Sequence, residues 1–563
     1  MKKSYIILFL FTYFVSAQSN YEINVINNRF QIDESKKLII CKVDISSIPN
    51  LNDFTDVDLV LGASKYYFKI KPETIDYQTA YNVFKNNTIY SLYFSVFPLI
   101  SITTDNEIVD EPKRLANFYY ADDESLKKSF VGIEIRGGFS QAFPKKTYDL
   151  EFWEDVNGKD SKNIQFGNLR NDDDWVLDAL YNEPLRIRSF SAHQLWLDMH
   201  EPYYITEEDE AKSGADVMYV DFFLNGDYRG VYMISEQVDR KQLKLKKYKN
   251  ETIRGELYKA ESWITGNVIF NGLPNYVNDS ETWGGYEVKL PDPDDTIDWE
   301  NLYSLKDFVM NSDLQTFRNE IADKVKIENA IDYFIFLNLT SAMDNRGKNI
   351  YVAKYTIDEP YFFVPWDLDG VFGIDWRGNN RNITDDVLSN GLFNRLLHIS
   401  PTDEVLIQIS NRWNELRSSI LSNSALQNRL VGNYNLLKDN LVFEREQLVW
   451  QNYPFNKTSK DYMMNWLDAR LQYLDTYFFS RLSTENFNRK ANQIKIYPNP
   501  TRGEVNIKYA SNNNIKYTLY NIEGVLISKG VMNSNTKKIS LQSFPSGIYF
   551  LKVKNSIKKI IKF

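Results

Sequence analysis

The sign of the net charge changes near residue 490, and this break constrains the architecture more than any single motif does. Residues 494–563 carry 11 Lys and one Arg against two Glu, a net charge of +10, so the total of −9 leaves −19 for residues 1–493. The basic segment alternates short apolar runs with Asn-, Gly- and Pro-containing turns, which is typical of strands. We therefore expect residues 494–563 to form a small β-sandwich that folds separately from the rest.

The composition narrows the classes of protein that the remainder can belong to. The length of 563 residues predicts roughly three or four domains. Apolar residues make up 43% and charged residues 25%, a balance that excludes collagen-like, coiled-coil and disordered chains. The negative charge argues against a nucleic-acid polymer as partner. Three His and one Cys exclude Cys- and His-rich metal sites, so a bound metal would take carboxylate and amide oxygens.

The first residues have the pattern of a signal peptide. Met1-Lys2-Lys3 is basic, Ser4–Phe14 is mostly apolar, and Val15-Ser16-Ala17 supplies small residues for cleavage before Gln18. The apolar run is shorter than the roughly 20 residues that a membrane-spanning helix needs. We expect residues 1–17 to be removed on export and no transmembrane segment to remain.

Two further regions precede the basic segment. Residues 18–125 alternate short apolar and aromatic runs with polar turns, which predicts a β-rich N-terminal region. Residues 126–490 have strand patterns first and helix patterns later, so we expect α+β architecture with a sheet-rich lobe before a helix-rich lobe. The expected strands are Lys37–Ile45, Val57–Leu61, Tyr66–Ile70, Thr88–Phe97, Gly132–Arg136, Tyr219–Leu224 and Gly230–Ser235. The expected helices are Pro184–Met199, Leu302–Val309, Ile327–Ala342 and Asp403–Leu421.

Residue types that could take part in catalysis occur in a particular order in the middle region. The motifs Gly-x-Ser-x-Gly, His-Glu-x-x-His and Gly-x4-Gly-Lys-Ser/Thr do not occur there. Instead a Gly-containing turn, Arg136–Ser140, follows a strand, and Lys145-Lys146 leads into the next strand. Much later Asp344 follows a predicted helix and Asn349 follows Asp344 after four residues. A predicted hairpin then ends before Asp367.

Phosphoryl transfer from a nucleotide uses these residue types in this order. A Gly turn lets backbone amides approach phosphates, and a Lys neutralises them. A carboxylate orients the acceptor hydroxyl, while an amide and a second carboxylate hold Mg²⁺. The Asp-x4-Asn spacing and the hairpin before a second Asp occur in protein kinases. The pattern therefore favours a kinase-like site.

Motifs in the basic segment resemble a known sorting domain. They are Ile496-Tyr497-Pro498-Asn499-Pro500 with Gly503, and Gly547-Ile548-Tyr549 before Leu551-Lys552-Val553. The segment resembles the type A C-terminal sorting domain of Bacteroidetes type IX secretion cargo. The resemblance implies that the type IX secretion machinery is a partner and that the protein is secreted or held at the cell surface.

Residues from about 97 to 480 are similar to the CotH family of atypical, secreted protein kinases. The matching stretches are Leu99–Asp105, Arg136–Ser140, Pro144–Lys146, Trp175–Arg188, Phe223–Val238, Asp344-Asn345, Lys348-Asn349 and Pro365–Asp369 with Gly373. The resemblance implies a kinase-like bilobal fold. It also implies transfer of phosphate from ATP, with Mg²⁺ or Mn²⁺, to Ser or Thr of secreted or surface proteins.

The same resemblance implies roles for three polar residues. Asp344 matches the essential catalytic Asp of the family, and Asp367 matches its metal-binding Asp. Asn349 fits the second metal ligand by its spacing from Asp344. These three residues are our candidates for the catalytic and metal sites.

The nucleotide-binding candidates are Lys146, Lys145, Arg136 and Glu236. We place Lys146 first as the phosphate-contacting Lys and Lys145 second, because strand alternation sends the two to opposite faces. Glu236 ends a predicted strand, where it is either part of the adenine-side connection between the lobes or the ion-pair partner of the Lys.

Some features depart from ordinary kinases and leave other functions open. The Gly turn is short, no His-Arg precedes Asp344, and Asp369 occupies the position of the Gly in the usual metal motif. A weak kinase, a nucleotide-binding pseudokinase, or a kinase with an unusual nucleotide or acceptor would fit these departures. Aromatic residues make up 15% of the chain, which also suits a non-catalytic adhesin or glycan-binding protein.

Overall fold

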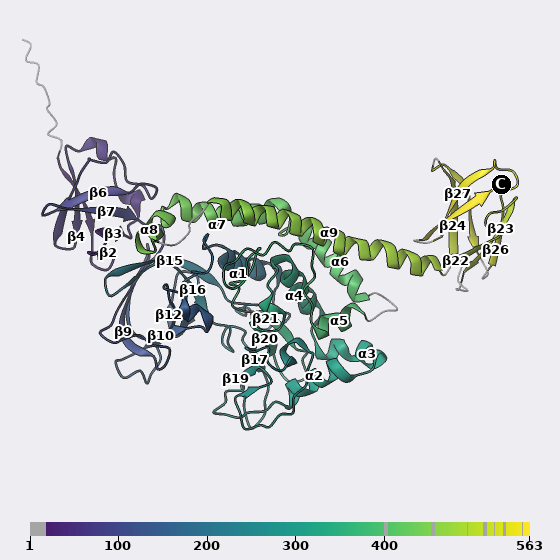
Figure 1. The fold of residues 1–563 in the computed structure, drawn as a ribbon, viewed down its shortest axis with the longest axis horizontal. Coiled ribbons are helices and arrows are strands. Elements are labelled where there is room, and N and C mark those ends of the chain that lie inside the picture. The colour runs from purple at the N-terminus through teal and green to yellow at the C-terminus, as the bar shows by residue number, and fades with distance from the viewer. Residues whose placement is uncertain are drawn as a thin grey trace, which may run out of the picture.

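The computed structural model describes residues 19–563 apart from 399–403, 452–456, 493, 510–514, 523, 533–535 and 554–555. The predicted signal peptide, residues 1–17, lies outside this part of the chain. An N-terminal sheet, a closed barrel, a helical region and a C-terminal pair of sheets follow one another (Figure 1). The mixed α/β content expected from the sequence is confirmed. Among the helices of the described residues, none has the length and apolar character needed to cross a membrane.

Seven strands form the N-terminal sheet, in the order β1-β4-β5-β6-β7-β3-β2. They are β1 Tyr21–Val25, β2 Phe30–Asp33, β3 Leu38–Cys41, β4 Val57–Leu61, β5 Ser64–Phe68, β6 Tyr81–Lys85 and β7 Thr88–Phe94. The free thiol of Cys41 is buried in the core of this sheet. Asp33 is buried against the barrel, where it accepts a hydrogen bond from the backbone N–H of Tyr228 at 3.0 Å. The sheet is thus joined to the barrel by polar contacts.

The barrel closes in the order β10-β11-β14-β16-β15-β8-β9. Its strands are β8 Leu99–Thr103, β9 Arg114–Ala121, β10 Leu126–Arg136, β11 Thr147–Trp153, β14 Asp174–Asp178, β15 Val217–Leu224 and β16 Asp227–Glu236. A short pair, β12 Ile164–Gln165 and β13 Asn171–Asp172, lies beside it. The β9–β10 hairpin pairs Ala121 with Leu126 and so crosses the boundary expected near residue 125. The polar turn between them resembles a linker in sequence, but it joins two strands of one barrel.

A five-stranded sheet and nine helices form the helical region of the described chain. The sheet has the order β18-β19-β17-β20-β21, with β17 Glu256–Ala260, β18 Thr282–Trp283, β19 Tyr286–Leu290, β20 Ile350–Lys354 and β21 Phe362–Pro365. The helices are α1 Arg188–Met199, α2 Glu300–Asn311, α3 Leu314–Lys324, α4 Ile327–Thr340, α5 Gly391–Leu397, α6 Glu404–Arg417, α7 Asn423–Asp439, α8 Val442–Val449 and α9 Lys457–Asn492.

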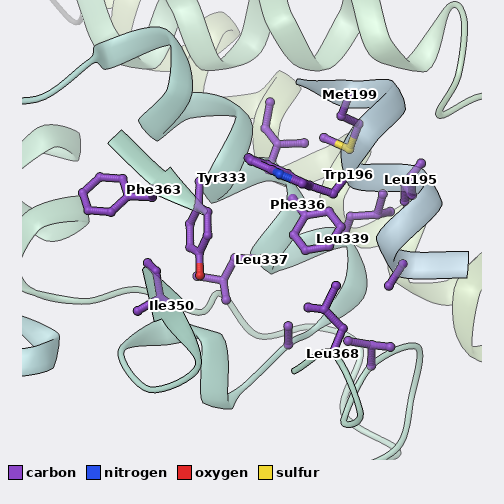
Figure 2. Close-up of a cluster of buried hydrophobic side chains, with 14 of the residues drawn as sticks. Leu195, Trp196, Met199, Tyr333, Phe336, Leu337, Leu339, Ile350, Phe363 and Leu368 are labelled. Atoms are coloured by element: carbon purple, nitrogen blue, oxygen red, sulfur yellow. The ribbon is translucent and has the colours of Figure 1, made fainter. Parts of the chain in front are cut away.

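Helix α4 is the centre of this region, because 12 of its 14 residues are buried. Figure 2 shows Tyr333 and Phe336 of α4 packed against Trp196 of α1, with Phe363 of β21 beside Tyr333. A helix that is apolar on most sides has to lie inside a larger core. Its C-terminal end is therefore fixed in place, and the candidate residue Asp344 follows four positions after Thr340, the last residue of α4.

The last seven strands form two antiparallel sheets, β22-β23-β26 and β25-β24-β27-β28. They are β22 Ile494–Tyr497, β23 Glu504–Tyr509, β24 Ile515–Asn521, β25 Leu526–Met532, β26 Thr536–Ser540, β27 Gly547–Val553 and β28 Ser556–Lys562. Ile507, Leu519 and Leu551 are fully buried between the sheets. In Figure 1 the long helix α9 connects this module to the helical region. The β-rich tail expected from the charge break is therefore present.

Candidate active site

Four carboxylates gather where the barrel meets the helical region. Asp178 ends β14, Asp344 begins the short 3-10 helix η5 (Asp344–Arg346), and Asp367 and Asp369 follow β21. Burial raises the pKa of Asp178, Asp344 and Asp369, and the negative charge of Asp367 raises each of them further. Solvent reaches the Asp367 side chain, but the protein around it raises the pKa of this carboxyl as well. Carboxylates that repel one another in this way make a strongly negative site.

The two residues predicted to hold a metal are in contact. The Asn349 amide donates a hydrogen bond from Nδ2 to Oδ2 of Asp367 at 3.2 Å. Both residues have left-handed backbone conformations, with φ of 56° for Asn349 and 52° for Asp367. Such conformations cost free energy for residues other than Gly and are common at functional sites. The structure therefore brings together Asn349 and Asp367, which are 18 positions apart in sequence.

Asn345 fixes the backbone that carries this pair. Its buried amide donates from Nδ2 to the carbonyl oxygens of Asn349 and Trp366, both at 2.7 Å. The Tyr333 hydroxyl of α4 donates to the carbonyl oxygen of Asn345, also at 2.7 Å. Asn345 thus links the central helix, the segment before β20 and the segment after β21.

We expect Asn345→Ala to lower the free energy of unfolding of this region by about 2–3 kcal/mol, because two buried carbonyl groups lose a donor. Urea unfolding followed by Trp fluorescence would measure the change. Asn382→Ala is the matched control, since Asn382 is exposed and should leave the unfolding midpoint unchanged. Equal midpoints for the two variants would contradict the linking role of Asn345.

Sequence reasoning missed two of the four carboxylates. Asp369 was interpreted as a departure from the kinase pattern, yet burial and the charges of Asp367 and Asp178 hold its pKa well above the usual range. Between Asp367 and Asp369, Leu368 is buried in the hydrophobic core (Figure 2). Asp178 was not singled out, although a single Asp at the end of the apolar run Trp175–Leu177 was a usable signal.

Two cations face the carboxylates. The positive charge of Lys348 lowers the pKa of Asp344, Asp367 and Asp369, and within the described chain this ammonium has no ion-pair partner. Arg136 donates to Oδ2 of Asp149 at 2.5 Å, and its charge lowers the pKa of Asp367. The predicted Arg136 therefore lies at the site, and Lys348 joins it as a residue that the sequence analysis did not assign.

Lys145 is the lysine that lies near Asp178. Its buried ammonium donates to Oε1 of Glu446 at 2.9 Å and to the carbonyl oxygen of Val231 at 2.6 Å. Burial lowers the pKa of Lys145 to about 7 despite the attraction of Glu446 and Asp178. Glu446 belongs to α8, 301 residues further along the chain, so no local pattern could have paired it with Lys145.

Lys146 has a different environment. Its Nζ donates to the carbonyl oxygen of Gln141 at 2.5 Å, within the 3-10 turn η3 (Phe139–Ala142) that follows the two glycines. The two lysines point to different partners, as alternation predicted. Of the pair, Lys145 is the one whose charge lowers the pKa of Asp178.

Glu236 does not pair with either lysine. Its buried carboxylate accepts from Lys212 Nζ at 2.6 Å, from the backbone N–H of Arg170 at 2.8 Å and from Nε2 of Gln242 at 2.9 Å. The alternative in which Glu236 is the ion-pair partner of the phosphate-contacting Lys is therefore wrong. Lys212 forms the ion pair with Glu236 at the end of β16 instead.

Arg186 and Arg188 both fall in the expected helix Pro184–Met199, where residues two positions apart do not share a face and only one of them would point inward. Arg186 instead has a φ of 59°, so α1 begins at Arg188, and both side chains are fully buried. Arg186 donates from Nη2 to Oε2 of Glu446 at 2.9 Å, and Arg188 donates from Nη1 to Oε2 of Glu183 at 2.7 Å. The left-handed residue changes the direction of the chain and allows both guanidinium groups to find buried carboxylates.

We expect Glu446→Gln to destabilise the protein by about 3–5 kcal/mol, because it leaves Lys145 and Arg186 buried without a countercharge. Because Lys145 has a pKa of about 7 in the folded protein, the deficit should be largest below pH 7 and shrink as rising pH neutralises the amine. Urea unfolding at pH 6 and pH 8.5 measures both effects. Glu444→Gln, on the exposed face of the same helix, should change neither midpoint. A deficit that grew with pH would exclude this account.

The donor set suits Mg²⁺ or Mn²⁺ bound together with phosphates. Within the described chain, no three His, Cys, Asp or Glu side chains lie close enough to hold a metal ion by themselves. Asp367 and Asn349 offer a carboxylate and an amide oxygen side by side, which are ligands that hard divalent cations prefer. A divalent cation would also relieve the mutual repulsion of the four carboxylates. The residues therefore fit a cation that completes its shell with water and phosphate oxygens.

Two family models match the chain. The family model described as CotH kinase protein matches residues 133–474, more than half of the chain, and this span contains every candidate residue discussed above. The model described as secretion system C-terminal sorting domain matches residues 495–563. No curated protein matches the chain.

Proposed function

Because this chain belongs to the CotH kinase protein family, we propose that it is a secreted protein kinase that transfers the γ-phosphoryl group of ATP to Ser or Thr of extracellular or surface proteins. Its type IX sorting domain indicates export, so the protein is secreted or located at the cell surface. The observation that carries the proposal is the contact between Asn349 and Asp367 beside Asp344. An Asn and an Asp in contact, with a further Asp nearby, are the residue types that kinases use to hold Mg²⁺ and to orient the acceptor.

The proposed fold is bilobal and kinase-like. The barrel would form the first lobe, the helical region would form the second, and ATP would bind between them. Arg136 and Asp178 would line the barrel side, while Asp344, Asn349 and Asp367 would line the other. The hairpin β20–β21 supports this division, because it separates Asn349 from Asp367 in sequence and returns them to contact.

Each charged side chain has a distinct part in the proposed reaction. Asp367 and Asn349 would hold a Mg²⁺ or Mn²⁺ ion, which neutralises charge on the phosphate oxygens. Lys348 has no ion pair within the described chain, so its ammonium is free to contact a phosphate oxygen. Lys145 would be positioned by Glu446, in the way that kinases pair a Lys with a Glu.

Asp344 would accept the proton of the acceptor hydroxyl. Its side chain is half-buried, and its raised pKa brings the carboxylate nearer to neutral pH than an exposed Asp. A base is most effective when its pKa approaches the working pH. Asp344 would therefore orient the Ser or Thr hydroxyl toward the γ-phosphate and take up its proton as the bond to phosphorus forms.

Nucleotide binding and phosphate transfer together test the proposal. ATP with Mg²⁺ or Mn²⁺, at 100 times its dissociation constant, should stabilise the protein by about 2.7 kcal/mol in thermal unfolding. Labelled ATP should transfer its γ-phosphate to the protein itself or to total secreted protein. Binding without transfer would indicate a pseudokinase, and the absence of both would contradict the proposal.

An observation on the N-terminal sheet supports a second candidate function, that of a non-catalytic adhesin or glycan-binding protein. Tyr67 of β5 and Phe84 of β6 are 44% and 39% exposed, and their rings lie 5.5 Å apart on the N-terminal sheet. Exposed paired rings can stack on sugars. Glycan binding that Tyr67→Ala and Phe84→Ala abolish, in a chain that does not bind ATP, would favour the adhesin.

A further inference from the structure

Two arginines near the carboxylate site, Arg346 just after Asp344 and Arg377 on the loop that Asn182 joins to Asp369, have no ion-pair partner within the described residues. Arg346 follows Asp344 by two positions, and its positive charge lowers the pKa of that carboxyl. Arg377 follows Asp375, a residue whose charge also acts on Asp344, and its side chain is exposed. Guanidinium groups that are left unpaired beside a catalytic candidate are available to a ligand.

Both guanidinium groups are held on indole rings. Cζ of Arg346 lies 5.5 Å from the ring centre of Trp263, and its buried Nε has no hydrogen-bond partner in the described part of the chain. Trp263 lies against the backbone at Gly347, where a Cβ atom would approach its ring to 2.9 Å. This close approach keeps the ring, and with it the guanidinium, next to the segment that carries Asp344.

The second platform lies on the loop after the metal-binding segment. Cζ of Arg377 lies 4.3 Å from the ring centre of Trp376. The Trp376 ring makes an edge contact with Phe139 of η3, with ring centres 4.5 Å apart. Stacking holds a guanidinium in one orientation while its N–H donors stay free. The arrangement therefore reduces the entropy that binding a carboxylate would cost.

Two acidic side chains of this part of the molecule, Asp375 and Glu261, have hydrogen-bond partners other than Arg346 and the Arg377 side chain. Asp375 accepts hydrogen bonds from the backbone N–H groups of Arg377 and Asn379, both at 2.9 Å. Glu261 accepts from Lys259 at 2.5 Å. Within the described residues neither Arg346 nor Arg377 forms an ion pair with these carboxylates, so both guanidinium groups keep N–H donors for a ligand.

We propose that Arg346 and Arg377 select acceptor segments that carry Asp or Glu close to the Ser or Thr that is phosphorylated. The planar fork of a stacked arginine matches a carboxylate in a bidentate contact. This inference rests on the proposed kinase function, because it names the class of acceptor for the same site.

Three peptides with the same central Ser, flanked by Glu, by Ala or by Lys, test the preference on the full-length protein. We expect kcat/KM for the Glu-flanked peptide to exceed that for the Ala-flanked peptide at least tenfold. Arg346→Gln and Arg377→Gln should each reduce this ratio about tenfold or more. Arg346→Lys should restore only part of it, since Lys lacks the planar fork. Arg502→Gln, an exposed change in the C-terminal sheets, should leave the ratio as it is.

Equilibrium binding of labelled peptides, with Ala in place of the central Ser, separates this inference from the kinase proposal. Tighter binding of the Glu-flanked peptide that both Gln variants lose would support the acceptor preference even if no phosphate were transferred. Equal binding of all three peptides, or tighter binding of the Lys-flanked one, would overturn it. A rise in KM for ATP with an unchanged peptide ratio would also overturn it, because the arginines would then bind the nucleotide.

Discussion

Asp344→Asn should lower phosphate transfer at least a hundredfold while ATP and metal binding persist. The amide has the same shape as the carboxylate, so the half-buried position at the start of η5 should be kept. An amide cannot accept the proton of the Ser or Thr hydroxyl, and general-base catalysis contributes about 10²–10⁴-fold to such rates. Transfer of label from ATP, measured beside the ATP-induced thermal shift, separates loss of chemistry from loss of binding.

Asp385→Asn is the matched control for this prediction, because Asp385 is an exposed carboxylate. Transfer by this variant should equal that of the unchanged protein. Equal transfer by Asp344→Asn would remove Asp344 from the reaction. Loss of the thermal shift together with transfer would instead indicate that Asp344 supports the bound nucleotide.

The bounds of strands and helices were predicted well where a single hydrophobic periodicity determined them. The strand Val57–Leu61 matches β4 at both ends, and the expected helix Ile327–Ala342 differs from α4 only at its end. Their burial on one or more faces produces a periodicity that can be read directly. The boundary near residue 125 could not be placed, because a polar hairpin turn and a linker have the same composition.

The candidate site was predictable where its residues are close in sequence. Asp344, Asn349 and Asp367 lie within one helix–hairpin unit, so spacing alone could bring them together. Glu446 could not be found in this way, because it reaches Lys145 only through the packing of α8 on the barrel. Alternation separated Lys145 from Lys146 but could not tell which of them would face the carboxylates.

The sequence could not show which charged side chains lack an ion-pair partner. Lys348 and Arg346 flank Gly347 in a polar stretch, where a basic residue is usually a solvated surface group. Only the structure shows that Arg346 lies on Trp263 and that Lys348 acts on three carboxylates. The proposed function therefore depends on which charged side chains the fold leaves without ion-pair partners, and sequence spacing does not contain that information.

Asp367→Asn should abolish the stabilisation that ATP gives in the presence of Mg²⁺ or Mn²⁺, a loss of about 2.7 kcal/mol at 100 times the dissociation constant. The variant keeps a side chain that can contact Asn349 but loses the anionic ligand. Without ligand it should unfold at the same temperature as the unchanged protein or higher, because the charge of Asp367 raises the pKa of Asp178, Asp344 and Asp369. Removing that charge relieves repulsion within the site.

Asp367→Asn should thus remove the stabilisation by ATP without lowering the unfolding temperature of the free protein. This combination distinguishes a metal ligand from a structural residue. A structural carboxylate would lower the unfolding temperature of the free protein when replaced, whereas a metal ligand held among like charges would not. Asp295→Asn, an exposed change in a loop, should leave both the free and the ATP-bound unfolding temperatures unchanged. A full ATP-dependent shift in Asp367→Asn would exclude Asp367 from the metal site. A large fall in the unfolding temperature of the free variant would assign Asp367 a structural role instead.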